Sequence, residues 1–311
     1  MSPLTVLLAL LAALSNAAAS VLQRRAAADE PEDGAGMRQT VRWLARAPRK
    51  GAWLAGAGLL ALSAVLQALA LAVGGLSVVQ PLMASELLFT LVVGSVVFRR
   101  RPSRRTWLAF LALACGLALF LTAAEPSPGR STATPGRWPV TGAAVLCALV
   151  LLVAVARPLR GAPRAALLGL ASAVAFAATA ALLKEVTGTV AQGWGAVFTR
   201  WPLYALAGVG ALAFVLLQSA LRAGTLTASQ PALTLGDALT SVALGWVLFD
   251  EVIALGVRVL PEVIGAVLIG AGSVGLARAP TVSGAWDAPP GGCGGPGPGA
   301  PSPRPHRTAD P

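Results

Sequence analysis

Nine apolar runs constrain the fold of this chain more than any other feature of its sequence. Each run is about 20 residues long, the length that an α-helix needs to cross the hydrocarbon core of a bilayer. Of the 311 residues, 56% are hydrophobic and only 12% are charged, which leaves too few polar side chains to cover a soluble protein of this size. The runs are Pro3–Leu22, Gly51–Gly74, Gly75–Phe98, Thr106–Ala124, Trp138–Ala156, Ala165–Leu183, Trp201–Leu221, Gly224–Phe249 and Val259–Ala277. We therefore expect an all-α polytopic membrane protein with nine transmembrane helices.

The basic residues predict the orientation of these helices. Of the 24 Lys and Arg residues, 19 lie in the segments on one side of the predicted bundle, and only Arg130, Arg137, Lys184, Arg200 and Arg258 lie on the other. Because cytoplasmic segments carry the excess of Lys and Arg, the N-terminus is expected outside the cell membrane and the C-terminus in the cytoplasm. The basic residues flank apolar runs and form no patch with aromatic residues, so we expect no nucleic-acid partner despite the net charge of +11.

The third and eighth runs resemble each other. Gln80–Phe98 reads QPLMASELLFTLVVGSVVF and Gln230–Phe249 reads QPALTLGDALTSVALGWVLF. Both begin with Gln-Pro, end in Gly-x-Val-x-Phe and hold one carboxylate near the middle. These carboxylates, Glu86 and Asp237, stand 151 residues apart, as do the two closing motifs. A carboxylate within a membrane span is costly and usually functional, so the pair is the strongest functional signal in the sequence.

The duplication predicts the organisation of the whole chain. The first copy begins at the first span and the second copy at the sixth, an odd number of crossings later, so the copies must be inverted relative to each other. Two inverted four-helix repeats with a linking helix between them are typical of secondary transporters, whose site lies near the midplane where the repeats meet. The predicted parts are repeat one at 1–124 with a cytoplasmic loop at 23–50, a linker with the linking helix at 125–164, repeat two at 165–278, and a disordered, Gly- and Pro-rich cytoplasmic tail at 279–311.

Polar residues within the spans give the candidate site. Gln230, Thr234, Asp237 and Ser241 follow one another in steps of four, three and four, so they share one helical face. Lipid would leave such a stripe without hydrogen-bond partners, so it is expected to face the bundle interior. For the amides and hydroxyls, hydrogen bonding between helices is as good an explanation as substrate binding. The candidate substrate- or proton-binding residues are Glu86, Asp237, Gln67, Gln218, Gln80, Gln230, Thr234 and Asn16.

The two carboxylates are predicted to lack a cationic partner, because no Lys or Arg lies within any of the nine runs. A buried carboxylate of this kind can exchange a proton or take up a cation. Pro81 and Pro231 each follow the Gln that opens its run. These prolines either break the helix and free carbonyl groups for a ligand, or lie in a first turn where proline is tolerated.

A family resemblance covers about residues 1–278. The segment from Gln218 to Pro231, followed by Gly245-Trp-Val-Leu-Phe-Asp-Glu251, resembles the helix-turn-helix of the drug/metabolite transporter superfamily of EamA type, which ends in an acidic residue. Gly265 and Gly272 fit that family's glycine-spaced next helix. The resemblance implies a transporter of a metabolite or drug. The chain departs from the family in having nine helices instead of ten, and in having Arg99 or Arg100 at the first-half position that matches Glu251.

A nine-helix chain with a long basic loop after its first helix is also similar to the NIPA-type magnesium transporter branch. Magnesium keeps most of its waters and needs only one or two protein carboxylates, which Glu86 and Asp237 could supply. A divalent cation permease is therefore an alternative to a small-molecule transporter. In that alternative the two carboxylates would be the metal ligands.

The function expected from the sequence is secondary transport, coupled to protons or driven by the membrane potential, because no nucleotide-binding motif of the Walker type is present. We expect no enzymatic activity and no cofactor. The expected partners are the substrate, the lipid bilayer and, as one assembly that the chain could form, a second copy in a homodimer. A membrane scaffold or accessory subunit without a substrate is the remaining alternative.

Overall fold

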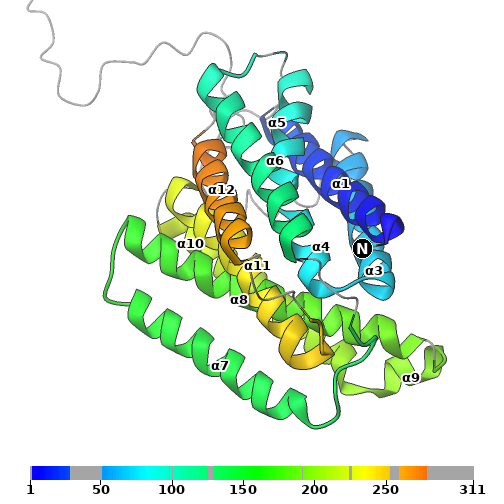
Figure 1. Ribbon diagram of the computed structural model, residues 1–311. Coiled ribbons are helices and arrows are strands. Elements are labelled where there is room, and N and C mark those ends of the chain that lie inside the picture. Colours follow the sequence, from blue (N-terminus) through cyan, green and yellow to red (C-terminus); the bar gives the residue numbers. More distant parts are fainter. Residues whose placement is uncertain are drawn as a thin grey trace, which may run out of the picture.

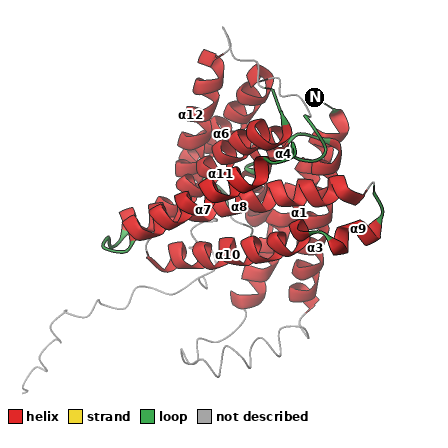
Figure 2. Ribbon diagram, turned by 90° about the horizontal axis from the view of Figure 1, so that it is seen from below, coloured by secondary structure: helices red, strands yellow, loops and turns green. Residues whose placement is uncertain are grey.

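The computed structural model describes residues 2–28, 51–97, 99, 101–124, 129–190, 192–223, 226–252 and 259–278. Within these residues all regular structure is helical (Figure 2). Nine segments among them are long and apolar enough to cross a membrane, which confirms the predicted all-α, multi-pass architecture. Helices are favoured because hydrocarbon offers no hydrogen bonds to the backbone, so each span must satisfy its own N–H and C=O groups. Most of the predicted cytoplasmic loop at 23–50 and all of the predicted tail at 279–311 lie outside the described residues.

The helices follow the predicted runs closely, with one span divided in two (Figure 1). Those of the first half are α1 (Pro3–Ala28), α3 (Gly51–Val73), α4 (Leu76–Met83), α5 (Glu86–Val97) and α6 (Arg104–Ala124). Those of the second half are α7 (Arg137–Ala156), α8 (Ala162–Val190), α9 (Trp194–Thr199), α10 (Trp201–Ala223), α11 (Leu226–Phe249) and α12 (Val259–Ala277). The third span consists of α4 and α5, which are separated by a turn.

The structure corrects the predicted end of the sixth span. Helix α8 does not end at Leu183 but continues for another seven residues, so Lys184 lies inside the helix and not in an outer loop. With 29 residues, α8 is about 44 Å long, more than the hydrocarbon core requires. The side chain of Lys184 is only 2% exposed. The prediction that no span holds a basic residue is therefore wrong.

Small residues allow α1 and α8 to act as the central helices of their halves. Helix α8 packs against α7, α10 and α11, and α1 packs against α3, α4 and α5. The buried faces of both helices are rich in alanine, with Ala12 and Ala13 in α1 and Ala171 and Ala175 in α8 at 0% exposure. Because alanine side chains are short, neighbouring helices approach closely and gain van der Waals contact, which drives helix association in lipid.

Glycine contacts join α6 to α12, which lie side by side (Figure 1). A methyl group added at Gly116 would come within 2.7 Å of the Ile269 nitrogen, and one added at Gly272 would come within 2.5 Å of the Leu113 nitrogen. Moving forward along α6 therefore means moving backward along α12, so the two helices are antiparallel. Backbone contact this close is the reason for glycine at both positions.

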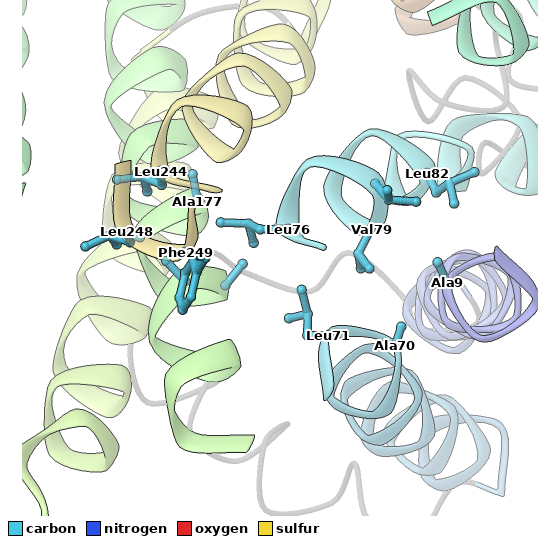
Figure 3. Packing of buried hydrophobic residues seen from close by; sticks show 14 of the residues in the cluster. Ala9, Ala70, Leu71, Leu76, Val79, Leu82, Ala177, Leu244, Leu248 and Phe249 are labelled. Carbon is cyan, nitrogen blue, oxygen red and sulfur yellow. The ribbon is translucent and has the colours of Figure 1, made fainter. Parts of the chain in front are cut away.

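The largest apolar cluster lies where the first half of the chain meets the second (Figure 3). Leu76 and Val79 of α4 lie between Phe249 at the end of α11 and the α1 and α3 side chains, such as Ala9 and Leu71. All five residues are at most 1% exposed. The short helix α4 is thus the first-half element that packs directly against α11.

Candidate functional site

Two of the predicted site residues meet between α1 and α5. The Asn16 Nδ2 atom donates a hydrogen bond of 2.7 Å to the Glu86 Oε2 atom. Glu86 is the first residue of α5 and half-buried, near the middle of the third span. An amide donor stabilises the negative charge of a carboxylate, so Glu86 lies in a polar site that α1 helps to form. The sequence predicted both residues as site candidates, but it did not reveal that they form a pair.

The break between α4 and α5 places Glu86 directly after a turn. Pro81 has no N–H group to donate within the helix, and α4 ends two residues later. The turn is closed by hydrogen bonds from the Ala84 nitrogen to the Pro81 oxygen, 3.1 Å, and from the Ser85 nitrogen to the Leu82 oxygen, 3.0 Å. The Ser85 hydroxyl is buried without a hydrogen-bond partner among the described residues. Broken helices at membrane depth are tolerated where protein or a wet cavity surrounds them, and they often form binding sites.

The second carboxylate, Asp237, has a different environment in the middle of α11. Its Oδ1 atom is buried and has no hydrogen-bond partner among the described residues. The same holds for the hydroxyl of Ser241, which lies one turn further along α11 and is 0% exposed. Helix α11 passes through Pro231 without a break. A buried polar atom without a partner is uncommon, and it marks a place where a proton, an ion, a water molecule or a substrate group would be stabilised.

The remaining polar candidates lie on four helices, α3, α4, α10 and α11. Gln80 is 5% exposed in α4, and the Thr234 hydroxyl donates to the Gln230 carbonyl oxygen in its own helix at 3.0 Å. Gln67 and Gln218 are half-buried on α3 and α10, helices that pack mainly against α1 and α8. Their expected position beside a cavity between the carboxylates stays a prediction. The described residues contain no group of three or more His, Cys, Asp or Glu side chains that could hold a metal ion.

A buried ion pair that the sequence analysis missed lies in the second half of the chain, and its carboxylate binds the first half through α4. Lys184 of α8 lies 2.5 Å from the Oε1 atom of Glu251, whose side chain is 0% exposed. The same carboxylate accepts hydrogen bonds from the backbone nitrogens of Leu76, 2.7 Å, and Ser77, 2.8 Å, and from the Ser77 hydroxyl. Glu251 therefore caps the N-terminus of α4, where the free N–H groups and the helix dipole favour a negative charge.

Two further residues fit around this ion pair. The Lys184 ammonium lies 4.6 Å from the centre of the Phe249 ring, a favourable cation–π distance. A methyl group added at Gly245 would come within 2.5 Å of the Glu251 Oε2 atom. Gly245 belongs to the closing motif of the eighth span, and its role is to leave space for the carboxylate. Sequence reasoning identified this glycine and Glu251 but assigned neither of them to Lys184.

A loop between α6 and α7 covers the same end of the bundle. The Arg130 nitrogen donates to the Phe249 oxygen at 2.7 Å, and the Thr134 nitrogen donates to the Leu248 oxygen at 2.8 Å. The Ala133 nitrogen donates to the Glu185 Oε2 atom at 2.7 Å. Residues 129–136 are therefore fixed by hydrogen bonds from their backbone N–H groups to the Glu185 side chain of α8 and to backbone oxygens at the end of α11.

Asp250 holds the start of α7 to this loop. It accepts a hydrogen bond of 2.7 Å from the Thr134 hydroxyl and forms an ion pair of 2.5 Å with Arg137. The Thr134 hydrogen bond, with the Arg137 guanidinium beside it, lowers the pKa of the Asp250 carboxyl below its ordinary value. A groove of about 350 Å³ beside this pair is lined by Arg137, Trp246, Val247, Asp250 and Val252.

Nine apolar spans among the described residues, one of them broken into two helices, define the chain as a multi-pass membrane protein. It is 30% identical over 280 residues to an uncharacterized protein of Corynebacterium glutamicum, a match that covers 86% of this chain and 94% of the relative. The chain belongs to the same family as that corynebacterial protein. No family model and no solved structure matches it.

Proposed function

We propose that the protein is a secondary transporter of the drug/metabolite type that moves a small molecule across the cytoplasmic membrane, coupled to protons or driven by the membrane potential. The observation that carries this proposal is the buried Oδ1 atom of Asp237, which has no partner among the described residues in the middle of a membrane span. Burying an ionised carboxylate without a donor costs several kcal/mol, roughly, so a purely structural Asp would be selected against. Uptake and release of a proton during transport would explain an Asp at position 237.

The proposed architecture is two inverted four-helix repeats, with α7 as the linking helix. Antiparallel packing supports it, because α6 and α12 are the last helices of the two repeats and inversion requires them to run in opposite directions. The contact between Gly116 and Ile269 corresponds to the contact between Leu113 and Gly272, as a two-fold axis between these helices would produce. The broken third span is a further feature in common with transporters of this architecture.

The proposed roles of the two carboxylates differ because their environments differ. Glu86 already accepts a hydrogen bond from Asn16, so its charge is partly satisfied and suits the binding of a polar or cationic substrate group. Among the residues that the structure describes, no such donor reaches the Oδ1 atom of Asp237, which suits proton coupling. Gln67, Gln80, Gln218, Gln230 and Thr234 would add hydrogen bonds to the substrate near these two positions.

The proposed orientation has the N-terminus outside and the C-terminus in the cytoplasm. Four segments predicted on the outer side meet at one end of the bundle: the start of α4, the end of α8, the loop 129–136 and Glu251. Arg99, Arg101, Arg104 and Arg105 are all exposed in the segment after the third span, which this orientation places in the cytoplasm. Outer and inner segments are thus separated as alternating crossings require.

The experiment that tests this function begins with purified protein and a panel of metabolites, drugs and divalent cations that includes Mg²⁺. Compounds that raise the unfolding temperature are binding candidates, because a ligand that binds only the folded state stabilises it. Uptake of each candidate is then measured in proteoliposomes for the wild type, for Asp237→Asn and for the control Asp250→Asn, which makes the same change at the exposed outer end. We expect uptake in the wild type and the control and its loss in Asp237→Asn.

The panel also separates the alternatives. Stabilisation and uptake of Mg²⁺ alone would favour the cation permease, with Glu86 and Asp237 as ligands. No stabilisation and no uptake for any compound would favour a membrane scaffold or accessory subunit. A change of the sedimentation profile with protein concentration would report whether the chain forms the expected homodimer.

A further inference from the structure

We infer that the Glu251 carboxylate, paired with Lys184 and bound to the first turn of α4, is the latch that closes the transport path at the end of the bundle where α4 begins. The inference rests on the proposed function, because a gate has a meaning only in a protein that opens alternately to two sides. It concerns residues outside the predicted site, and it assigns them a role that is distinct from substrate binding and from proton coupling.

The Glu251 carboxylate joins the parts that must separate when the path opens. Leu76 and Ser77 belong to the first half of the chain, whereas Lys184 and Glu251 belong to the second. Among the described residues, the first turn of α4 supplies the hydrogen bonds from the first half to Glu251. Opening a path between the halves at this end would require α4 to leave the Glu251 carboxylate. A gate at this end therefore has to break the hydrogen bonds between α4 and the Glu251 carboxylate.

The contact of Glu251 with Lys184 and α4 is strong and specific. Glu251 has three donors from α4 and one from Lys184, and both charged side chains are almost completely buried, with 0% and 2% exposure. Removing one partner of a buried ion pair is strongly destabilising, because the other charge stays buried without compensation. The Glu251 carboxylate thus binds both the N–H groups at the start of α4 and the Lys184 ammonium group of α8.

The position in the first half that corresponds to Glu251 cannot form the same contact. At the spacing that relates Glu86 to Asp237, Glu251 corresponds to Arg100 and Asp250 corresponds to Arg99. The sequence thus has arginine where the second half has the two acidic residues. An equivalent carboxylate latch is therefore absent from the sequence at the end of the third span. The latch is one-sided, and it favours the state that is closed at the α4 end.

Labelling of a buried cysteine with a membrane-impermeant maleimide added from outside tests the latch. The probe is Val79→Cys in α4, at a position that is 0% exposed, in a background where Cys115, Cys147 and Cys293 are replaced by serine. The control probe is Ala213→Cys, also 0% exposed, at the contact between α8 and α10. The latch is weakened by Glu251→Gln, in which an NH2 donor replaces one of the two acceptor oxygens that face Lys184 and α4, and in a second variant by Lys184→Met, which removes the charge that pairs with Glu251.

We expect the Val79→Cys probe to react at least about tenfold faster in both latch variants than in the wild type, since each variant leaves buried groups without partners. The control probe should keep its wild-type rate. Asp250→Asn, which breaks the neighbouring exposed ion pair with Arg137, should leave both probes unchanged. The milder Ser77→Ala, which removes one donor and keeps the ion pair, should give an intermediate rate and serves if either charge variant fails to fold.

Unchanged labelling of Val79→Cys in folded latch variants would overturn the inference. Equal acceleration of both probes would also overturn it, because that result describes a general loss of packing. The outcome for the proposed function is separate. If the wild type transports nothing but the latch variants still expose Val79→Cys alone, Glu251 does hold this end of the bundle closed, and the proposed transport function is wrong. If the wild type transports and Val79→Cys stays protected in every variant, only the latch is wrong.

Discussion

Arg99 and Asp250 adopt the same left-handed backbone conformation, with φ angles of 50° and 53°. They are the only residues other than glycine with a positive φ in the described part of the chain, and they stand 151 residues apart, the spacing that also relates Glu86 to Asp237. Each follows the phenylalanine of a Gly-x-Val-x-Phe motif at the end of its span. The internal similarity seen in the sequence thus extends to an uncommon backbone conformation, which supports the proposed duplication.

Replacing Arg99 with glycine tests whether this conformation is strained. The left-handed region is unfavourable for residues with a Cβ atom, whereas glycine adopts it freely. We expect Arg99→Gly to raise the free energy of unfolding by about 0.5 to 1 kcal/mol, seen as a higher unfolding temperature in detergent. Arg104→Gly, within the first turn of α6, is the control and should lower stability. Equal effects of the two substitutions would contradict the assignment of strain to Arg99.

The contact between α6 and α12 predicts that Gly116 tolerates no side chain. A Cβ atom there would lie within 2.7 Å of the Ile269 nitrogen and 2.8 Å of the Gly265 oxygen, both of them backbone atoms. Since backbone atoms cannot move aside like a side chain, we expect Gly116→Val to lower stability by about 1 to 3 kcal/mol. Gly208→Ala, where nothing lies within 4 Å of the added atom, is the control. If both variants unfold at the wild-type temperature, the close crossing of α6 and α12 is wrong.

The lowered pKa of Asp250 predicts a pH-dependent contribution to stability. Because the pKa of this carboxyl is lower in the folded protein than in the unfolded chain, its contribution is present above the unfolded value, about 3.9, and is lost as the pH falls through the folded value. We expect Asp250→Asn to unfold at a slightly lower temperature than the wild type at pH 6. This difference should shrink progressively as the pH is lowered below the unfolded value. A difference of the same size at every pH would contradict the assigned role of Asp250.

The proposed orientation can be tested by labelling from the two sides of the membrane. A cysteine introduced as Ser131→Cys, between α6 and α7, should react with an impermeant reagent from outside the cell. Its control, Arg160→Cys between α7 and α8, should react only after the cytoplasmic side is made accessible. A reporter fused after Pro311 should be cytoplasmic. Labelling of Ser131→Cys from the cytoplasm alone would refute the topology with nine spans and the N-terminus outside.

The sequence predicted the number of spans because helix formation in a bilayer depends on a local property, a run of about 20 apolar residues. It also predicted the tight connection at Gly74 and Gly75, the two residues between the end of α3 at Val73 and the start of α4 at Leu76. The break of the third span was only partly predictable. Pro81 indicated it, but Pro231 stands in the same sequence context and lies inside an unbroken helix. What differs is the surrounding packing, which a proline alone does not reveal.

The main error, the placement of Lys184, has a physical explanation. A lysine followed by a glutamate at the end of an apolar run is typical of a helix leaving the membrane, because an unpaired charge in lipid is costly. Here the partner of Lys184 is Glu251, 67 residues later in the chain, and no local pattern could reveal that pairing. The contact between Asn16 and Glu86 is similarly remote, at a separation of 70 residues. Local patterns identified the polar residues, but only the fold showed which of them meet.

Proton movement in proteoliposomes tests most directly whether Asp237 couples transport to protons. A pH-sensitive dye inside the vesicles reports proton flux when a compound that stabilises the protein is added outside. We expect flux in the wild type and in Asp250→Asn, and a decrease of at least about tenfold in Asp237→Asn, which keeps the shape of the side chain and removes its titratable group. Glu86→Gln should weaken substrate binding more than proton flux per substrate. Wild-type proton flux in Asp237→Asn, with the protein folded and inserted, would contradict the account.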